Sequence, residues 1–218
     1  MHEIERFISG FRTFQDDYFG PEGSRFDTLK HGQSPKTMVI GCSDSRVDPA
    51  ILTNSGPGDL FTVRNVANLV PPCEDDRGRH GVSAALEFAV CFLQVEHIIV
   101  LGHSQCGGIR ALMEGGCDHT ANGFIARWMS IAAPARAQVL AELPSRDPEI
   151  QRQAAEQAAI LLSLENLHSF PFVDERVNAG QLTLHGWYFD LAHGELLEYD
   201  AESRGFRRLA TAEEQRNS

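Results

Sequence analysis

Two short apolar runs in this sequence each lead directly into a group of chemically active side chains. Residues 37–40 precede Gly41-Cys42-Ser43-Asp44-Ser45-Arg46, and residues 98–101 precede Gly102-His103-Ser104-Gln105-Cys106. Runs of this kind predict buried strands, and helical patterns separate them along the chain. Strands that alternate with helices indicate an α/β domain with a parallel sheet, in which ligands bind beyond the carboxyl ends of the strands. If the two strands are neighbours, both polar motifs belong to one site.

The remaining elements fit one α/β domain over residues 1–218. Apolar periodicity predicts helices over residues 2–19, 24–31, 49–53, 82–94, 109–113, 122–132, 135–143 and 147–168, with a further short helix that ends at Gly180. It also predicts a strand over 60–65 and a hairpin of 182–189 with 196–199. We expect a central, mostly parallel β-sheet flanked by helices, with an N-terminal helical arm (1–35) and a C-terminal β-hairpin at the sheet edge. The polar tail, 211–218, is expected to fray.

Charge and cysteine content limit the partners and the compartment. The formal net charge of -11 argues against nucleic acid and anionic membranes, because both require a basic surface. No apolar run approaches the ~20 residues that span a bilayer, and the N-terminus has no signal-peptide pattern. The five cysteines are an odd number, which is poor evidence for a disulfide framework. We therefore expect a cytoplasmic protein with no nucleic-acid or membrane partner, whose thiols are reduced or bind metal.

Cys42, His103 and Cys106 offer two thiolates and an imidazole, which are ligands that zinc prefers. His103 and Cys106 lie three residues apart at a helix start, so both side chains can face one point. Catalytic zinc typically has three protein ligands and a fourth position open to water. Asp44 can fill that position in a closed state or stand aside for water, and the sequence does not decide between these states. Arg46 can hold the Asp44 carboxylate through paired hydrogen bonds.

Each of these residues alone also has a purely structural explanation. Buried free cysteines are common, and a single histidine at a strand end is often only hydrogen-bonded. The metal hypothesis rests on three such residues at the ends of two strands. Cys73, Cys91 and Cys117 have no partner at ligand spacing, and the other histidines have no assigned role. Among them, His80 between two glycines is a candidate proton carrier.

Several motifs, in this order, are similar to those of the β-class carbonic anhydrases. They are Cys42-Ser43-Asp44-Ser45-Arg46, Arg64-Asn65-Val66-Ala67-Asn68, Gly81-Val82-Ser83-Ala84-Ala85-Leu86-Glu87, Gly102-His103-Ser104-Gln105-Cys106-Gly107-Gly108 and Leu184-His185-Gly186-Trp187. The similarity extends over nearly the whole chain. Within the family, the chain is most similar to the bacterial branch that includes the carbonic anhydrase of cyanate operons.

The resemblance implies the zinc-dependent, reversible hydration of carbon dioxide to bicarbonate and a proton, by attack of zinc-bound hydroxide on CO2. It implies one Zn²⁺ per chain, held by Cys42, His103 and Cys106. Asp44, fixed by Arg46, would accept the hydrogen bond of the hydroxide and aim its lone pair at the carbon.

The resemblance also implies a substrate pocket and self-association. Gly107, Gly108, Val66 and Phe88 are the expected substrate-binding residues. Many family members have tyrosine at the position of Phe88, so we expect a more apolar CO2 pocket here. The expected minimum unit is a dimer, which can assemble further into a tetramer or octamer, with the N-terminal helix reaching across to the partner subunit.

Two other functions would use most of the same residues. A hydrolase of carbon disulfide or carbonyl sulfide would use the same nucleophile, and access to the pocket would decide between the substrates. A non-enzymatic zinc or redox-sensing module would use Cys42 and Cys106, but it does not need a fixed carboxylate beside the metal. Asp44 and Arg46 therefore favour the hydratase.

Overall fold

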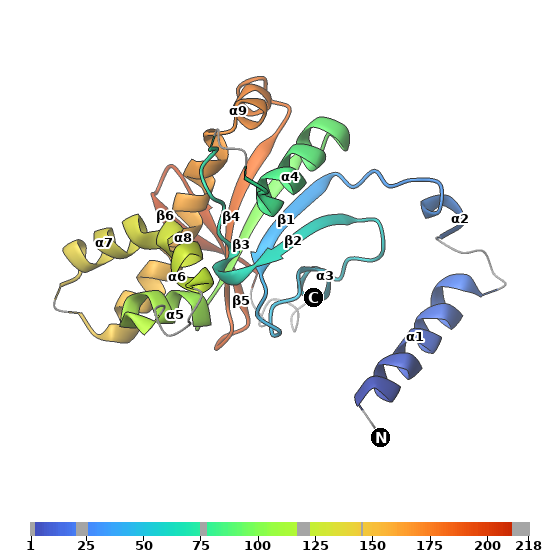
Figure 1. The fold of residues 1–218 in the computed structure, drawn as a ribbon, viewed down its shortest axis with the longest axis horizontal. Coiled ribbons are helices and arrows are strands. Elements are labelled where there is room, and N and C mark those ends of the chain that lie inside the picture. The colour runs from blue at the N-terminus through green and yellow to red at the C-terminus, as the bar shows by residue number, and fades with distance from the viewer. Residues whose placement is uncertain (1–2, 21–25, 75–77, 117–122, 145, 211–218) are drawn as a thin grey trace.

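A computed structural model of the chain describes residues 3–20, 26–74, 78–116, 123–144 and 146–210. One sheet has the strand order β2-β1-β3-β4-β5-β6. The strands are β1 (Thr37–Cys42), β2 (Leu60–Asn65), β3 (His97–His103), β4 (Thr183–Asp190), β5 (Glu195–Asp200) and β6 (Gly205–Ala210). The first four of these run parallel, and β5 and β6 extend the sheet antiparallel (Figure 1). This confirms the predicted α/β fold with a mostly parallel sheet.

Helices flank this sheet, and α8 packs along β3 and β4 while it also contacts α5 and α7. The helices are α1 (Glu3–Phe19), α2 (Phe26–Leu29), α3 (Pro49–Leu52), α4 (Gly81–Glu87), α5 (Gly107–Glu114), α6 (Phe124–Met129), α7 (Ala133–Glu142), α8 (Pro148–His168) and α9 (Pro171–Asn178). None of the helices in the described ranges is long and apolar enough to cross a membrane.

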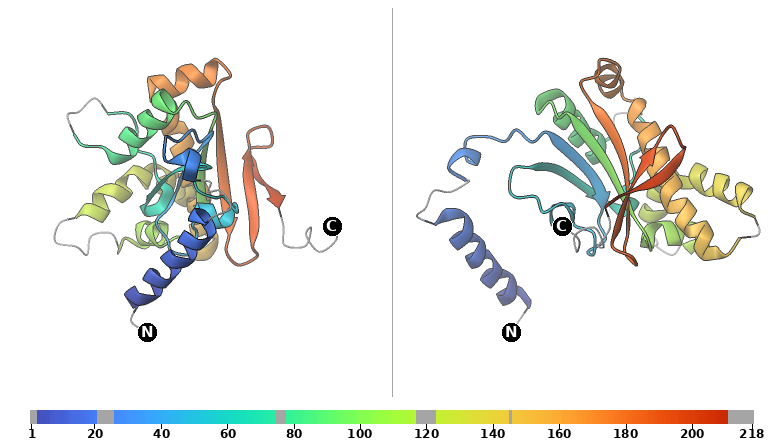
Figure 2. Two further views of the ribbon diagram at one scale, coloured as in Figure 1. Left: turned by 90° about the vertical axis from the view of Figure 1, so that its right-hand side faces the viewer. Right: turned by 180° about the vertical axis from the view of Figure 1, so that it is seen from behind.

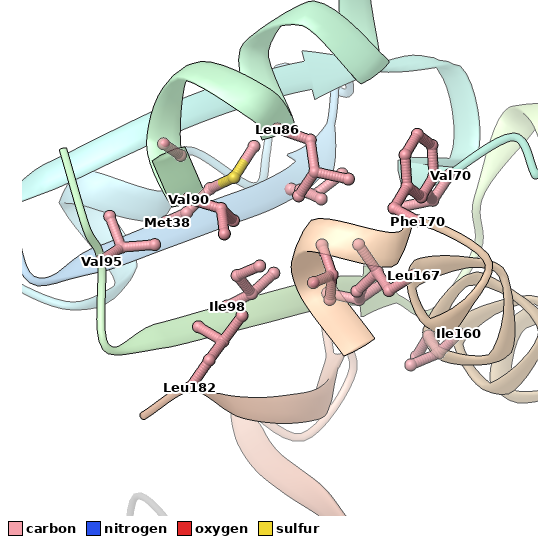
Figure 3. Close-up of a cluster of buried hydrophobic side chains, with 14 of the residues drawn as sticks. Met38, Val70, Leu86, Val90, Val95, Ile98, Ile160, Leu167, Phe170 and Leu182 are labelled. Carbon is pink, nitrogen blue, oxygen red and sulfur yellow. The ribbon is translucent and has the colours of Figure 1, made fainter. Parts of the chain in front are cut away.

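A cluster of apolar side chains fixes the central strands relative to the helices (Figure 3). Met38 of β1 and Ile98 of β3 lie in register beside each other and are fully buried. Leu86 of α4, Leu167 of α8 and the adjoining Phe170 pack against them. Full burial of each such side chain stabilises the fold by ~1.5–3 kcal/mol. This core keeps β1 beside β3, so the ends of both strands lie at one edge of the sheet.

Two elements differ from the sequence-based expectation. The helix predicted over 82–94 ends as an α-helix at Glu87 and continues as a π-helical turn, Phe88–Phe92. The predicted C-terminal hairpin gains a third strand, β6. β6 pairs antiparallel with β5, and its Arg207 and Arg208 also form ion pairs with Glu198 and Glu195 of β5, so the segment is too charged to resemble a strand in the sequence.

The N-terminal helix α1 lies apart from the rest of the chain in Figure 1 and in the right-hand view of Figure 2. None of its residues is buried in this chain. Some predictions fall outside the described residues: the first residue of the 2–19 helix, the start of the 24–31 and 122–132 helices, Cys117 and the tail 211–218.

Candidate active site

The structure brings the two polar motifs together. β1 and β3 pair in parallel with Gly41 opposite Leu101, so Cys42 and His103 lie at the same edge of the sheet. Cys106 is the residue immediately before α5, which begins at Gly107. The two sulfur atoms and one imidazole nitrogen all lie within 4.8 Å of one another, and all three residues are buried. The predicted convergence of Cys42, His103 and Cys106 is therefore confirmed.

The donor atoms of this cluster suit zinc. His103 Nδ1 lies 2.8 Å from the carbonyl oxygen of Ser104. Because a carbonyl only accepts, Nδ1 carries the proton and Nε2 presents its lone pair. Nε2 is buried and has no hydrogen-bond partner among the described residues, which is costly for a polar atom unless a ligand binds it. Two thiols and this nitrogen are a typical zinc donor set.

The two thiols shift each other's pKa in opposite directions, and Cys42 is the one that favours the thiolate form. The hydrogen bond from Cys106 lowers the pKa of Cys42. The same bond, and then burial, raise the pKa of Cys106, while the N–H groups of Ile109 and Gly108 at the start of α5 oppose that rise. Since the thiolate is the metal-binding form, the helix N-terminus supports Cys106 as a ligand.

Asp44 is locked in place by Arg46. Its Oδ1 accepts hydrogen bonds from the backbone N–H of Arg46 at 3.0 Å and from Nε at 2.9 Å, and its Oδ2 accepts one from Nη2 at 2.7 Å. These bonds hold the pKa of Asp44 well below its usual range, so the carboxylate is ionised. In the described part of the chain, Asp44 does not belong to the cluster of potential metal ligands. In the structure Asp44 is thus paired with Arg46, and its place relative to a bound metal stays a prediction.

Arg64 is a second clamp on the same loop, and our reading of the sequence gave it no role at the site. Its Nε donates to the carbonyl of Cys42 at 2.9 Å, and its Nη2 donates to the carbonyl of Asp44 at 2.7 Å. Its Nη1 pairs with Asp48 Oδ2 at 2.7 Å. Arg64 is the penultimate residue of β2, and nothing in the sequence shows that β2 pairs with β1.

Glu156 is another residue that sequence reasoning missed. It lies on α8, where its Oε1 accepts a hydrogen bond from the backbone N–H of Cys106 at 2.9 Å. Its Oε2 accepts one from the hydroxyl of Tyr188 at 2.8 Å. The sequence signal that could have identified Glu156 is an acidic residue on a helix face that also carries the buried Ala155 and Ala159.

The predicted substrate-binding residues divide into two groups. Val66 lies against the start of α5, since a Cβ on Gly108 would be 2.8 Å from Val66 Cγ1. Val66 also lines a hollow of about 720 Å³, together with Trp128 and the candidate proton carrier His80.

Phe88 does not line that hollow in the described chain. Its ring stacks between those of Phe61 and Phe92, with centroid distances of 5.8 and 5.4 Å, and it is partly exposed. The structure therefore groups Val66 with Gly108 and places Phe88 elsewhere, and a substrate role for any of them remains a prediction.

Known proteins resemble this chain throughout its length. Residues 37–196 match the family model described as carbonic anhydrase. A carbonic anhydrase of Synechocystis sp. is 36% identical over 93% of this chain and 73% of its own length. Beta carbonic anhydrase 3 of Arabidopsis thaliana is 40% identical over 92% of this chain and 79% of its own length.

Solved structures agree with these relatives. The β-carbonic anhydrase CcaA superposes with a TM-score of 0.89 at 34% identity, covering 97% of this chain and 94% of that one. One of two tetrameric β-carbonic anhydrases from the fungus Sordaria macrospora superposes with a TM-score of 0.72 at 30% identity, covering 89% and 92%. The cluster of Cys42, His103 and Cys106 is typical of the zinc site in that class, so it agrees with the sequence and structural matches. The chain belongs to the β-class carbonic anhydrases, the zinc enzymes that catalyse the reversible hydration of carbon dioxide to bicarbonate and a proton.

Proposed function

We propose that Cys42, His103 and Cys106 hold one Zn²⁺ per chain and that Asp44, oriented by Arg46, is the catalytic carboxylate. The observation that carries this proposal is the buried Nε2 of His103, which has no hydrogen-bond partner in the described part of the chain and lies within 4.8 Å of two buried thiols. The ionised Asp44 carboxylate lies beside them, two residues after Cys42. Bound zinc acts as a Lewis acid, which lowers the pKa of water from ~15.7 towards ~7.

Asp44 orients the nucleophile. Its carboxylate cannot donate a hydrogen bond while it is ionised, so it accepts one from the O–H that attacks CO2. The paired bonds from Arg46 prevent the carboxylate from rotating freely, and the backbone N–H of Asp44 donates to Cys42 Sγ at 3.4 Å. Carboxylate, guanidinium and metal ligand therefore move as one unit, which keeps the lone pair of the nucleophile directed at the carbon.

Val66, Gly107 and Gly108 are proposed to form the wall against which CO2 binds. A Cβ on Gly107 would meet no heavy atom within 4 Å, so the glycine leaves open space at the start of α5. Val66 supplies an apolar surface beside it. We propose that Phe88 contributes to a CO2 pocket only in the assembled protein, because its exposed ring lies away from Val66 in a single chain.

The test is a carbon dioxide hydration assay with zinc analysis of wild type and Asp44→Asn. Wild type should contain one zinc per chain, and Asp44→Asn should keep its zinc and lose most of its activity, because an amide cannot accept the bond in the same way. Asp174→Asn is the matched control, since Asp174 is also an aspartate in a side-chain pair. Its partner is His168, the last residue of α8. Zinc-loaded wild type that fails to hydrate CO2 at any pH up to ~9, where the metal-activated nucleophile is formed, would contradict the proposal.

The minimum unit is proposed to be a dimer, with α1 packing on the partner and further assembly into a tetramer or octamer. The apolar side chains of α1 support this: Phe7 and Phe11 are 56% and 57% exposed, and no residue of α1 is buried by the described part of the chain. The tetrameric Sordaria enzymes show that such assembly occurs in similar proteins. Sedimentation equilibrium tests it, and a monomer at micromolar concentration is the opposing result.

Three broader assignments are also proposals. Residues 1–218 would form one domain with a helical arm, and the compartment would be the cytoplasm, consistent with the free thiols of Cys42, Cys73, Cys91 and Cys106. Membership of the cyanate-operon branch rests on the motifs alone, because the relatives described above come from a cyanobacterium, a plant and a fungus. A gene deletion that leaves growth on cyanate unchanged would contradict membership of the cyanate-operon branch.

A further inference from the structure

Glu156 is a buried carboxylate that the proposed reaction does not use. It is 5% exposed and lies on α8 among fully buried apolar residues such as Ala159 and Ile160. Removing a carboxylate from water is costly unless hydrogen bonds satisfy it, and burial raises the pKa of Glu156 accordingly. A residue of this kind on a helix that packs against the metal cluster requires a structural reason.

Glu156 contacts the turn between two of the proposed zinc ligands on one side and β4 on the other. Its Oε1 accepts the backbone N–H of Cys106, the last residue of this turn, at 2.9 Å. The backbone N–H groups of Cys106 and Gln105 lower the pKa of the carboxylate, against the effect of burial. The hydroxyl of Tyr188 donates to Oε2 at 2.8 Å and fixes the carboxylate from the other side.

The turn itself has an unfavourable backbone conformation that needs support. Gln105 has a φ of 59°, in the left-handed region, where a residue with a side chain is destabilised by ~1 kcal/mol or more. Glu156 accepts the N–H of Cys106 at the end of this turn, and Arg46 Nη2 donates to the Gln105 carbonyl at 3.1 Å. The same Arg46 holds Asp44. The turn thus connects Glu156 to the Asp44–Arg46 pair.

We propose that Glu156 is a positioning residue for the metal centre. It holds the turn from His103 to Cys106 in the left-handed conformation that directs His103 Nε2 and Cys106 Sγ to one point. Without it, the turn relaxes, Cys106 moves out of ligand geometry and the metal is bound less tightly. The inference rests on the proposed zinc role of these two ligands.

The test compares Glu156→Ala and Glu156→Gln with a control on the same helix. Ser163→Ala is well matched, because Ser163 is also fully buried on α8 and its Oγ accepts a backbone N–H, that of Val70, at 3.2 Å. Ser163 is two helical turns away from Glu156, so its loss removes a similar bond without touching the turn. Three quantities are measured for each protein: zinc affinity by competition with a chromophoric chelator, the thiolate-to-metal absorption of the cobalt-substituted form, and the urea midpoint.

Glu156→Ala should bind zinc ~10–100-fold more weakly and should shift the cobalt absorption, as expected for the loss of a group that orients a ligand. Glu156→Gln keeps an acceptor for the Cys106 N–H, so its loss of affinity should be smaller, about 3- to 10-fold. Ser163→Ala should lower the urea midpoint but leave zinc affinity and the cobalt spectrum unchanged. If Glu156→Ala does not fold, Glu156→Gln compared with Ser163→Ala gives the same test.

Two results would overturn the inference, and they are distinguishable from a failure of the proposed function. One is wild-type zinc affinity in the folded Glu156 variants, and the other is an equal loss of affinity in Ser163→Ala. A wild-type protein that binds no zinc would instead refute the proposed metal site and, with it, the role of Glu156.

Discussion

Two guanidinium groups shape the loop after β1, and they act on different atoms. Arg46 holds the side chain of Asp44, whereas Arg64 holds the backbone carbonyls of Cys42 and Asp44. The first contact governs where the carboxylate points, and the second governs where the loop lies. Loss of the Arg46 contact should therefore affect catalysis more than metal binding.

Arg46→Gln tests this separation. The variant keeps a donor but loses the paired bonds to Asp44, so the carboxylate can rotate and the nucleophile is misdirected. We expect kcat/KM for CO2 hydration to fall by about 100-fold, the typical consequence of a misplaced catalytic group, while zinc content stays at one per chain. Arg208→Gln, which breaks a pair with Glu195 on β5, is the control and should retain wild-type activity. Full activity in Arg46→Gln would show that the pair is structural.

Gly108 and Gly107 offer a second test at the level of single atoms. A Cβ on Gly108 would lie 2.8 Å from Val66 Cγ1 and 3.2 Å from Ala67 Cβ, whereas one on Gly107 would meet nothing within 4 Å. Gly108→Ala should therefore destabilise the fold by ~1–3 kcal/mol through overpacking and lower kcat/KM by displacing Val66. Gly107→Ala should unfold at the same urea concentration as wild type or a slightly higher one. Equal urea midpoints for the two variants would contradict this packing.

The sequence predicted the residues of the site that directly follow strands, but not the residues that reach it from elsewhere. Cys42, Asp44 and His103 could be found because strand ends in a parallel sheet converge. Arg64 and Glu156 act through contacts that depend on strand order and helix packing, and neither is visible in local sequence. Glu156 contacts Cys106 across 50 residues of chain.

Among the secondary-structure elements, α1 has the least explanation within a single chain. Its apolar side chains are exposed, and the helix lies apart from the sheet (Figure 2). Exposed apolar faces of this kind normally mark an interaction surface. A second copy of the chain is the proposed occupant.

Phe11→Ser tests the role of α1 in assembly. The change removes a large apolar group from the exposed face, so the dimer should dissociate at protein concentrations where wild type is associated. The secondary structure of the body should not change, because Phe11 is exposed and does not belong to the described hydrophobic core of the sheet. Gln15→Ala, on the same helix, is the control, and light scattering after size exclusion gives the masses. An unchanged mass for Phe11→Ser would mean that α1 is not the contact.

Elements with clear apolar periodicity were predicted well, and the charged edge of the sheet was not. β1 and β3 consist almost entirely of buried residues, so their apolar runs are visible in the sequence. β6 lies at the edge of the sheet and contains Arg207 and Arg208, which pair with Glu198 and Glu195 of β5, so it has no apolar run that would predict a strand. The segment Phe88–Phe92 was predicted as part of an α-helix, because an apolar pattern over so few residues does not distinguish an α-helix from a π-helical turn.

At the scale of the whole molecule, the sheet assembles one buried site from residues that are far apart in the chain. β1 supplies Cys42, β3 supplies His103, and Cys106 immediately precedes α5. Glu156 of α8 accepts the hydrogen bond of the Cys106 backbone N–H. The net charge of -11 fits a small substrate instead of a polyanion. The architecture therefore serves one small, rigid metal centre.

Removal and return of the metal test the central claim most directly. Dialysis against a strong chelator should give an inactive protein, and titration with zinc should restore CO2 hydration linearly until one equivalent per chain is bound. His103→Ala removes the buried nitrogen that has no partner among the residues the structure describes, and it should neither bind that equivalent tightly nor regain activity. Full activity in the metal-free protein, or recovery of His103→Ala with the wild-type stoichiometry, would contradict the account.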